Sequence, residues 1–317
     1  MLSYLCLHVA MEARETVELP AYAGSTLRGA FMSALKQTRC MGSQTCGDVC
    51  DWPSTCAYGF LCETPVPRDA PGRIRASKFA PHPFVISPPE GGMVPAGGKL
   101  RFELTLWGTG LRHLPAVLQA LEQMAAAGMG RGRKKLRLIR GVDANTKTTL
   151  SDGSNISLAD VAPQSTQWNT DKTSHKSAAL RVDFTTPAKL KSRGELVTEF
   201  DFGELVYHAA DRLYLLCHCH GDTSFTPNRG ELASRARDAD VKLVEDTIRR
   251  VSFARYSQRQ ARKHRLDGVM GHLLFVGDIG PFLSVLRSAE LFHLGKGTSF
   301  GLGAIEVRVE GPPVSKD

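Results

Sequence analysis

The sequence lacks any apolar run close to the roughly 18–20 residues that a helix needs to cross a bilayer. Residues 1–10 have neither the basic start nor the long apolar stretch of a secretory signal peptide. Aromatic residues make up only 7% of the chain, whereas the hydrophobic share of 42% and the charged share of 23% are ordinary for globular proteins. We therefore expect a soluble cytoplasmic protein with no membrane partner. Its 317 residues suffice for two domains.

The familiar nucleotide-binding motifs are also missing, although residues 294–303 are rich in glycine. This stretch holds Gly295, Gly297, Gly301 and Gly303. A P-loop needs a glycine where Glu290 stands, and a dinucleotide fingerprint needs one where Phe300 stands. A nucleotide-binding enzyme is therefore disfavoured. The stretch either binds an anion through its N–H groups and Lys296 or only connects a helix to a strand.

Positive charge is in excess, with 40 Lys and Arg against 32 Asp and Glu, and the pI is near 9.1. This excess suggests a polyanionic partner. The positive charge is concentrated in residues 249–265, and residues 253–266 contain no acidic residue. Cations that pair with phosphates and aromatics that stack on bases favour RNA binding here over a solvated charged surface. The predicted RNA contacts are Arg255, Tyr256, Arg259, Arg262 and Lys263, with a second tract at Arg131, Arg133, Lys134 and Lys135.

Cysteine is unevenly distributed, since five of the eight cysteines fall within residues 40–62. In a cytoplasmic chain such a cluster more often binds metal than forms disulfides. Four thiolates match a structural zinc site, with an iron–sulfur cluster or free thiols as the alternatives. The predicted ligands are Cys40, Cys46, Cys50 and Cys56, and Cys62 can replace one of them. The run from Cys217 to His220 ends a predicted helix and is expected to pack there rather than bind metal.

Hydrophobic periodicity predicts an α+β protein. In the first half, strands are expected at 2–9, 100–107 and up to 142, with helices at 25–38 and 111–127. In the second half, strands are expected at 178–186, 195–201, 251–256, 268–276 and 304–309, with helices at 202–221, 229–250 and 281–293. Each half approaches the β-α-β-β-α-β order of a ferredoxin-like domain. We expect domains at 1–150 and 178–317, separated by a polar linker or insertion at 151–177.

Four stretches together resemble one known family. They are GSTLRGAFMSALK at 24–36, the cysteine segment through CETPVP at 40–67, FARYSQRQARKHRLDGVMGHLLFVGDIGPFLSVLR at 253–287, and HLGKGTSFGLGAIEV at 293–307. The family is the CRISPR-associated endoribonucleases of the RAMP superfamily that process precursor crRNA, in the subgroup with a cysteine-rich insertion.

The resemblance implies two tandem ferredoxin-like (RRM-like) domains, with a cysteine-rich insertion at 40–62. It also implies a glycine-rich loop that grips RNA, here through Lys296, Thr298 and Ser299. The reaction expected is attack of a 2′-hydroxyl on the neighbouring phosphate, without a catalytic metal ion. The products would be a 2′,3′-cyclic phosphate and a 5′-hydroxyl. The expected partners are CRISPR repeat RNA, the retained crRNA and other CRISPR effector subunits.

The first helix departs from the family's pattern, because many relatives carry a histidine there and residues 24–39 contain none. We predict that Arg28 and Lys36 stabilise the negative phosphorane and that Arg39 contacts RNA. A proton carrier is expected in Tyr22 or in a distant histidine, with His264 considered first, His293 second and His8 third. The missing histidine also leaves open a non-catalytic crRNA-binding subunit of an effector complex.

Overall fold

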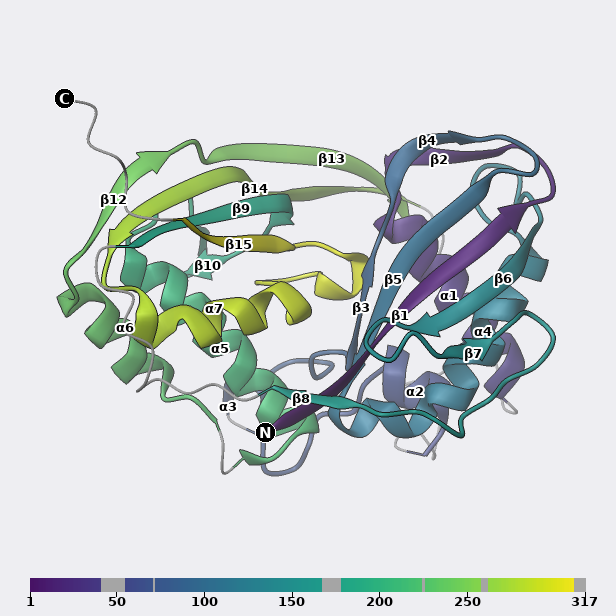
Figure 1. Cartoon of the computed structure of the whole chain (residues 1–317), viewed down its shortest axis with the longest axis horizontal. Helices are drawn as coiled ribbons and strands as arrows, with labels where there is room; N and C mark the ends of the chain where they lie inside the picture. Colours follow the sequence, from purple (N-terminus) through teal and green to yellow (C-terminus); the bar gives the residue numbers. More distant parts are fainter. Residues whose placement is uncertain (41–54, 71, 167–177, 224–225, 258–261, 311–317) are drawn as a thin grey trace. The chain divides into compact units, whose positions relative to one another are not determined.

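The structure is a computed structural model that describes residues 1–40, 55–70, 72–166, 178–223, 226–257 and 262–310 (Figure 1). Within these ranges, the side chains of residues 73, 254–257 and 262–264 are left undescribed. The chain divides into two compact units. The first comprises Met1–Ser165 with Leu216–Asp222, and the second comprises Thr166–Leu215 with Thr223–Asp317. The first unit thus runs past the boundary expected at residue 150. No helix in the described part of the chain is long and apolar enough to cross a membrane.

The first unit is built on an antiparallel sheet with β1 at its centre. The sheet order is β3-β5-β1-β6-β7, and β8 also pairs with β1. Its strands are β1 (Leu2–Ala13), β3 (Phe84–Ser87), β5 (Lys99–Trp107), β6 (Leu136–Asp143), β7 (Thr149–Ser151) and β8 (Gln164–Thr166). A separate hairpin joins β2 (Val17–Tyr22) to β4 (Glu90–Val94).

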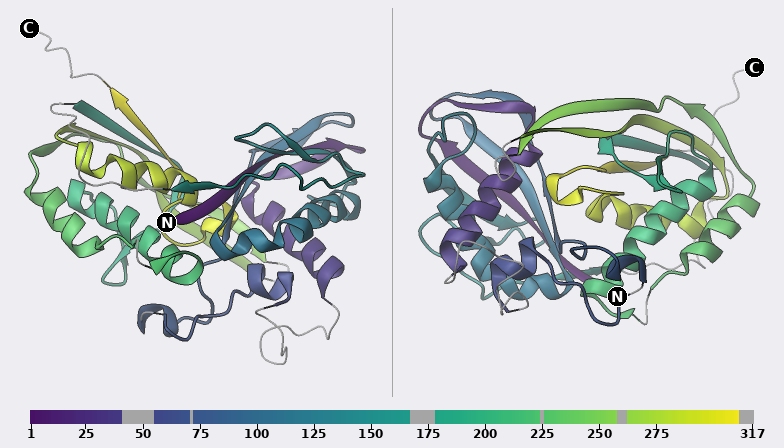
Figure 2. Two further views of the ribbon diagram at one scale, coloured as in Figure 1. Left: turned by 60° about the horizontal axis from the view of Figure 1, so that its bottom comes forward. Right: turned by 180° about the vertical axis from the view of Figure 1, so that it is seen from behind.

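Two helices, α1 (Gly24–Arg39) and α4 (Leu114–Ala127), cover one face of this sheet (Figures 1 and 2). The buried residues of α1 recur at helical spacing, so they form a stripe that packs on the alternating buried residues of β1. The α1 stripe consists of Leu27, Phe31, Ala34 and Leu35. Shorter elements complete the unit: α2 (Ala57–Cys62), α3 (Gly72–Arg75) and η1 (Gly108–His113).

The second unit repeats this plan. Its sheet has the order β12-β14-β9-β15, and β13 also pairs with β14. Its strands are β9 (Ala178–Ala188), β12 (Val241–Asp246), β13 (Arg249–Ser257), β14 (Arg262–Gly277) and β15 (Ile305–Glu310), with a small hairpin of β10 (Lys191–Ser192) and β11 (Glu195–Leu196). Its helices are α5 (Phe202–His220) as far as Leu215, α6 (Arg229–Asp238), α7 (Gly280–Phe292) and η3 (Thr298–Phe300). Numbered within each β-α-β-β-α-β repeat, both sheets run 2-3-1-4, which confirms two ferredoxin-like domains.

Three parts of the predicted secondary structure were wrong. The strand expected over 195–201 is reduced to β11 at Glu195–Leu196. The helix expected over 229–250 ends at Asp238, and the chain continues as β12 and β13. Val241, Val244 and Ile248 suit a strand, and pairing with β14 overrides the helical spacing. Strand β3 was not predicted, because it lies in the proline-rich passage at 65–89.

Candidate functional site

Arg28 on α1 meets a histidine from another element. Arg28 Nη2 lies 3.2 Å from His82 Nε2, and both side chains are half-buried. His82 stands two residues before Phe84, the first residue of β3. The Phe84 ring packs edge-on against the ring of Phe31 in the α1 stripe, with centroids 5.5 Å apart. The packing of β3 on α1 therefore brings His82 to Arg28.

The hydrogen bonds of His82 define its tautomer. An arginine side chain only donates, so Nε2 accepts from Arg28 and carries no proton. His82 Nδ1 lies 2.8 Å from Thr64 Oγ1, and the Thr64 hydroxyl donates to the Leu61 carbonyl at 3.3 Å. Because that hydroxyl proton is already used, Nδ1–H is the donor to Thr64. His82 is therefore a neutral imidazole whose Nε2 lone pair faces a guanidinium, which places a base beside a cation.

Lys36 lies two turns after Arg28, about 12 Å further along the helix axis. Its Nζ is 5.7 Å from the centroid of the Tyr58 ring, which is a cation–π distance. The Tyr58 hydroxyl in turn donates to Glu63 at 3.3 Å in a buried setting. Arg39, at the end of α1, donates to Gln119 of α4. The structure thus joins Arg28 to His82 and holds Lys36 apart from them.

Tyr22 ends β2 directly before α1. Burial raises the pKa of its phenol above the ordinary value, so the hydroxyl keeps its proton at neutral pH. A protonated phenol can donate a hydrogen bond but is a poor base. Tyr22 is therefore not suited to accept a proton from RNA.

In the second unit, the glycine-rich loop connects α7 to β15 with all four glycines at positive φ. A Cβ on Gly303 would lie 1.9 Å from the Leu294 carbonyl oxygen, and one on Gly295 would lie 2.5 Å from that of Lys189. Both positions therefore require glycine. The N–H groups of Leu294, Lys296 and Gly303 donate to carbonyls of the protein. The loop thus uses these three groups to hold its own shape rather than to bind an anion.

Arg212 of α5 anchors this loop from inside the unit. Its side chain is buried, its Nε donates to the Phe292 carbonyl at 3.2 Å, and its Nη2 donates to Thr298 Oγ1 at 2.9 Å. Thr298 and Ser299 are buried, whereas Lys296 is exposed. Of the three RNA contacts predicted in the loop, Lys296 is the one whose side chain lies at the surface.

Comparison with known proteins identifies the family. Residues 2–164 match the family model AF_1859_N, an N-terminal domain, and this match covers just over half of the chain. Residues 182–305 match the model of the CRISPR-associated endoribonuclease Cas6. The chain thus belongs to the AF_1859_N family over its first half and carries a Cas6 domain in its second half. An uncharacterized protein of Archaeoglobus fulgidus is 24% identical to it over 292 residues, which is 92% of this chain and 93% of that protein.

Solved Cas6 structures share the fold of this chain. A chain of a partial Cas6-RT-Cas1–Cas2 complex matches with a TM-score of 0.59 and 11% identity over 98% of this chain, which spans 46% of that longer chain. Thermus thermophilus Cas6 in a product complex matches with a TM-score of 0.54 and 18% identity, covering 96% of this chain and 100% of that one. At these identities the matches support the tandem ferredoxin-like fold.

The basic segment at 249–265 is an antiparallel hairpin of β13 and β14. The register sets Arg255 opposite His264 and Tyr256 opposite Lys263. The six predicted site residues of this segment all fall outside the described residues or side chains. They are Arg255, Tyr256, Arg259, Arg262, Lys263 and His264. Their contacts with RNA, and the role of His264 as a proton carrier, stay predictions.

The basic tract at 131–135 forms a tight turn after α4. Lys134 Nζ lies 3.2 Å from Glu15 Oε1, and Lys135 Nζ donates to the Ala126 carbonyl at 2.9 Å near the C-terminal end of α4. Arg131 lies 3.8 Å from Glu18. Arg133 is exposed and forms no ion pair within the described part of the chain. The two lysines thus have structural partners, and Arg133 is the residue of the tract best placed for a ligand.

Two of the four predicted metal ligands lie within the described residues. Cys56 Sγ is 3.9 Å from the Arg39 carbonyl oxygen, and Arg39 directly precedes Cys40. The two ends of the cysteine segment therefore meet at the end of α1, as a shared metal site requires. Cys46 and Cys50 fall outside the described residues. Zinc stays a prediction.

The other histidines and cysteines considered as site residues differ in burial: His293 and Cys217 are buried, and His8 is exposed. His293 is buried, and burial lowers its pKa to about 4. Its Nδ1 donates to the Leu302 carbonyl at 3.2 Å, so His293 is a neutral structural residue. His8 is exposed on β1, with Nε2 3.2 Å from Glu103. Cys217 is buried, and burial raises its pKa to about 11, in keeping with a packing role.

His82 escaped the sequence analysis because the search for a proton carrier centred on the first helix and the second half. A usable signal was present. His82 lies between two prolines, and the second of them directly precedes the apolar run Phe84-Val85-Ile86, which is typical of a strand start. A strand predicted there would have placed His82 at an edge of the first domain.

We predict that Arg212→Met loosens the glycine-rich loop. The substitution leaves the Phe292 carbonyl and the Thr298 hydroxyl without their donor, so the free energy of unfolding should fall by about 1–3 kcal/mol. RNA affinity should fall with it. Urea denaturation and RNA titration measure the two effects. The control is Arg235→Met on α6, where the arginine is exposed; an equal effect of both substitutions would contradict the anchoring role.

We also predict a pH dependence of stability from His293. Its folded pKa is about 4 against 6.5 ordinarily, so between these values the unfolded chain binds a proton that the folded chain does not. The free energy of unfolding should therefore decrease as pH falls through this window. In His293→Asn this decrease should be smaller, because asparagine does not titrate. Asparagine also tolerates the positive φ of 56°, and its amide can donate to Leu302, so the fold should be kept. Urea midpoints at several pH values in the window measure it, and identical slopes in both proteins would refute it.

Proposed function

We propose that this chain is an endoribonuclease that cuts CRISPR precursor RNA within its repeats and retains the crRNA product. The observation that carries the proposal is the pair of Arg28 and His82, which sets a base beside a cation on the first ferredoxin-like unit. The Cas6 domain supports the reaction class. The excess of positive charge supports a polyanionic substrate.

In the proposed reaction the RNA supplies its own nucleophile. The 2′-oxygen forms a bond to the neighbouring phosphorus while His82 Nε2 accepts the 2′-hydroxyl proton. Arg28 stabilises the added negative charge of the phosphorane. The bond from phosphorus to the 5′-oxygen then breaks, and that oxygen takes a proton from solvent or from His264. The products are a 2′,3′-cyclic phosphate and a 5′-hydroxyl, and we propose that no catalytic metal ion takes part.

The remaining cations are proposed to hold the RNA rather than to act on the scissile phosphate. Lys36 lies about 12 Å along α1 from Arg28, too far for both residues to act on one phosphate without a large movement. We therefore move Lys36 from a catalytic role to contact with a flanking phosphate. The other proposed contacts are Arg39, Arg131, Arg133, Lys134, Lys135, Lys296 and the basic residues of the β13–β14 hairpin. Cytoplasmic location and further CRISPR protein partners belong to the same proposal.

A second candidate function is a crRNA-binding subunit that does not cut. The observation in its favour is that α1 carries no histidine, unlike the helix of many relatives. In that case Arg28 and His82 would bind RNA without turnover. Incubation of the protein with repeat RNA in EDTA separates the two, because only the enzyme yields a cut product.

We predict that Arg28→Ala and His82→Ala each lower the single-turnover rate of repeat cleavage by about 100-fold or more, since each removes a group that acts in the transition state. RNA affinity should change far less. Replacement of the attacking 2′-hydroxyl by hydrogen should abolish cleavage. The control is Arg75→Ala, at an exposed arginine of the same unit. Cleavage at the wild-type rate in both Arg28→Ala and His82→Ala would rule out this catalytic centre.

We further propose that the cysteine segment holds a structural zinc ion through Cys40, Cys46, Cys50 and Cys56. Purified protein should contain one zinc equivalent more than Cys46→Ser/Cys50→Ser does, and the variant should unfold at lower urea. Cys219→Ser, which removes a thiol outside the segment, should keep the zinc. Iron in place of zinc would indicate a cluster, and the absence of both metals would favour free thiols.

A further inference from the structure

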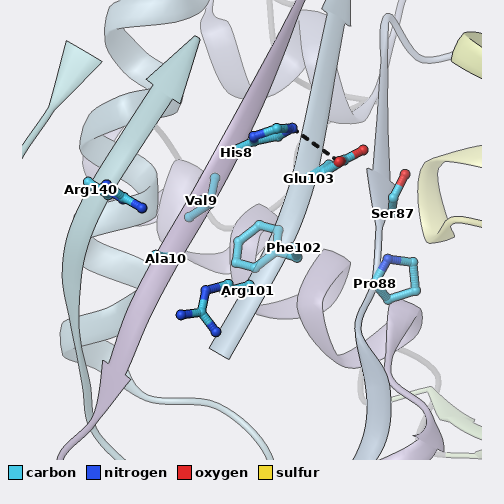
Figure 3. Close-up of a pocket in the computed structure, with 9 residues that line it drawn as sticks. All are labelled: His8, Val9, Ala10, Ser87, Pro88, Arg101, Phe102, Glu103 and Arg140. Carbon is cyan, nitrogen blue, oxygen red and sulfur yellow. Dashed lines mark ion pairs between the residues drawn. The ribbon is translucent and has the colours of Figure 1, made fainter. Parts of the chain in front are cut away.

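The first unit carries a second group of side chains that can bind a metal ion, on the face of its sheet opposite α1. A pocket of about 440 Å³ opens there over β1, β3, β5 and β6 (Figure 3). His8 and Glu103 line it and point toward each other, and Cys6 lies beside them on β1. None of these residues belongs to the proposed cleavage centre.

The sheet register explains why these side chains meet. Successive side chains of a strand alternate between faces, so Cys6 and His8 share one face of β1. The antiparallel pairing sets His8 opposite Glu103 and Cys6 opposite Thr105. Directly opposed side chains begin about 5 Å apart, close enough for their ends to touch. His8 Nε2 accordingly lies 3.2 Å from Glu103 Oε1.

We propose that Cys6, His8 and Glu103 bind a divalent transition-metal ion of the Zn²⁺ class. Their sulfur, nitrogen and oxygen ligand atoms all lie within 4.8 Å of one another. Tetrahedral zinc bonds of 2.0–2.3 Å place ligand atoms roughly 3.3–3.7 Å apart, so rotamer adjustments of about an ångström close the site. Thiolate, imidazole and carboxylate are all zinc ligands. Binding releases the Cys6 thiol proton to solvent.

The surroundings support such a site. β1 is the central strand and is paired on both sides, so two ligands stand on a rigid element. Thr105 stands directly opposite Cys6 in the register, where its hydroxyl can orient the thiol. His8 and Glu103 are exposed, whereas Cys6 is half-buried. Three protein ligands with an exposed side leave a fourth coordination position open to solvent, as in catalytic rather than structural zinc sites.

Two arginines beside this open position favour an anion as the fourth ligand. Arg101 and Arg140 stand on either side of Ala10, both exposed and with no ion pair to another described residue (Figure 3). On the sheet of the second unit, by contrast, Arg181 and Arg308 both pair with Asp183. The unpaired arginines of the first unit therefore leave positive charge next to the proposed ion. A phosphate or carboxylate group fits that charge better than a further cation does.

Cobalt spectroscopy tests the site directly. Full-length protein carrying Cys46→Ser/Cys50→Ser, which removes the competing thiol cluster, is stripped of metal and titrated with Co²⁺. We expect one equivalent to bind with a thiolate-to-cobalt charge-transfer band, which Zn²⁺ then abolishes. In this background Cys6→Ser should remove the band, and His8→Ala and Glu103→Gln should each weaken Co²⁺ binding by about tenfold or more. Cys219→Ser is the matched thiol control and should leave the band unchanged.

Absence of the band, or its survival in Cys6→Ser, would overturn the proposal. If Cys6→Ser fails to fold, the variants at the exposed His8 and Glu103 decide, because neither side chain contributes to the core. Cleavage of repeat RNA in EDTA is unaffected by this result, so failure of the metal site and failure of the proposed ribonuclease activity are separate outcomes.

Discussion

The antiparallel pairing of β3 with β5 fixes where His82 lies, and the proposed chemistry depends on it. The register sets Phe84 opposite Leu106, with both side chains buried. Phe84 then packs on Phe31 of α1. A slip of one residue would turn Phe84 to the other face of the sheet, so burial of this ring selects the register. Hydrophobic packing in the core of the first unit thus determines whether a base and a cation meet at its surface.

The two units use one fold for different purposes. In the second unit a buried arginine, Arg212, holds the glycine-rich loop, and Arg181 and Arg308 on the sheet both pair with Asp183. In the first unit Arg28 faces a neutral histidine and lies only partly buried. The same β-α-β-β-α-β scaffold therefore carries some arginines that are paired within the protein and others, such as Arg28, that are placed to meet a ligand. The functions differ through a few side chains, as expected when sites are grafted onto a common fold.

The fold was predictable because it rests on local patterns. Helical spacing in α1, α4 and α7 and the alternation in β5 are visible within short windows of sequence. The errors lie where distant contacts decide. The segment after Asp238 has helical spacing but pairs with β14, and β3 becomes a strand because β5 offers an edge. Arg28 could be found from its place on the first helix, but His82 is 54 residues away along the chain, and no local pattern joins the two.

The contact between Arg28 and His82 also suggests how the proposed centre would respond to RNA. Without a ligand, Arg28 donates to a neutral imidazole nitrogen, a weaker partner than an anionic phosphate oxygen. An arriving phosphodiester therefore competes successfully for the guanidinium. As Arg28 turns to the phosphate, His82 Nε2 loses its donor while Thr64 still holds Nδ1–H in place. The lone pair that Arg28 had occupied then faces the RNA, so binding of the scissile phosphate itself would release the base that the reaction needs.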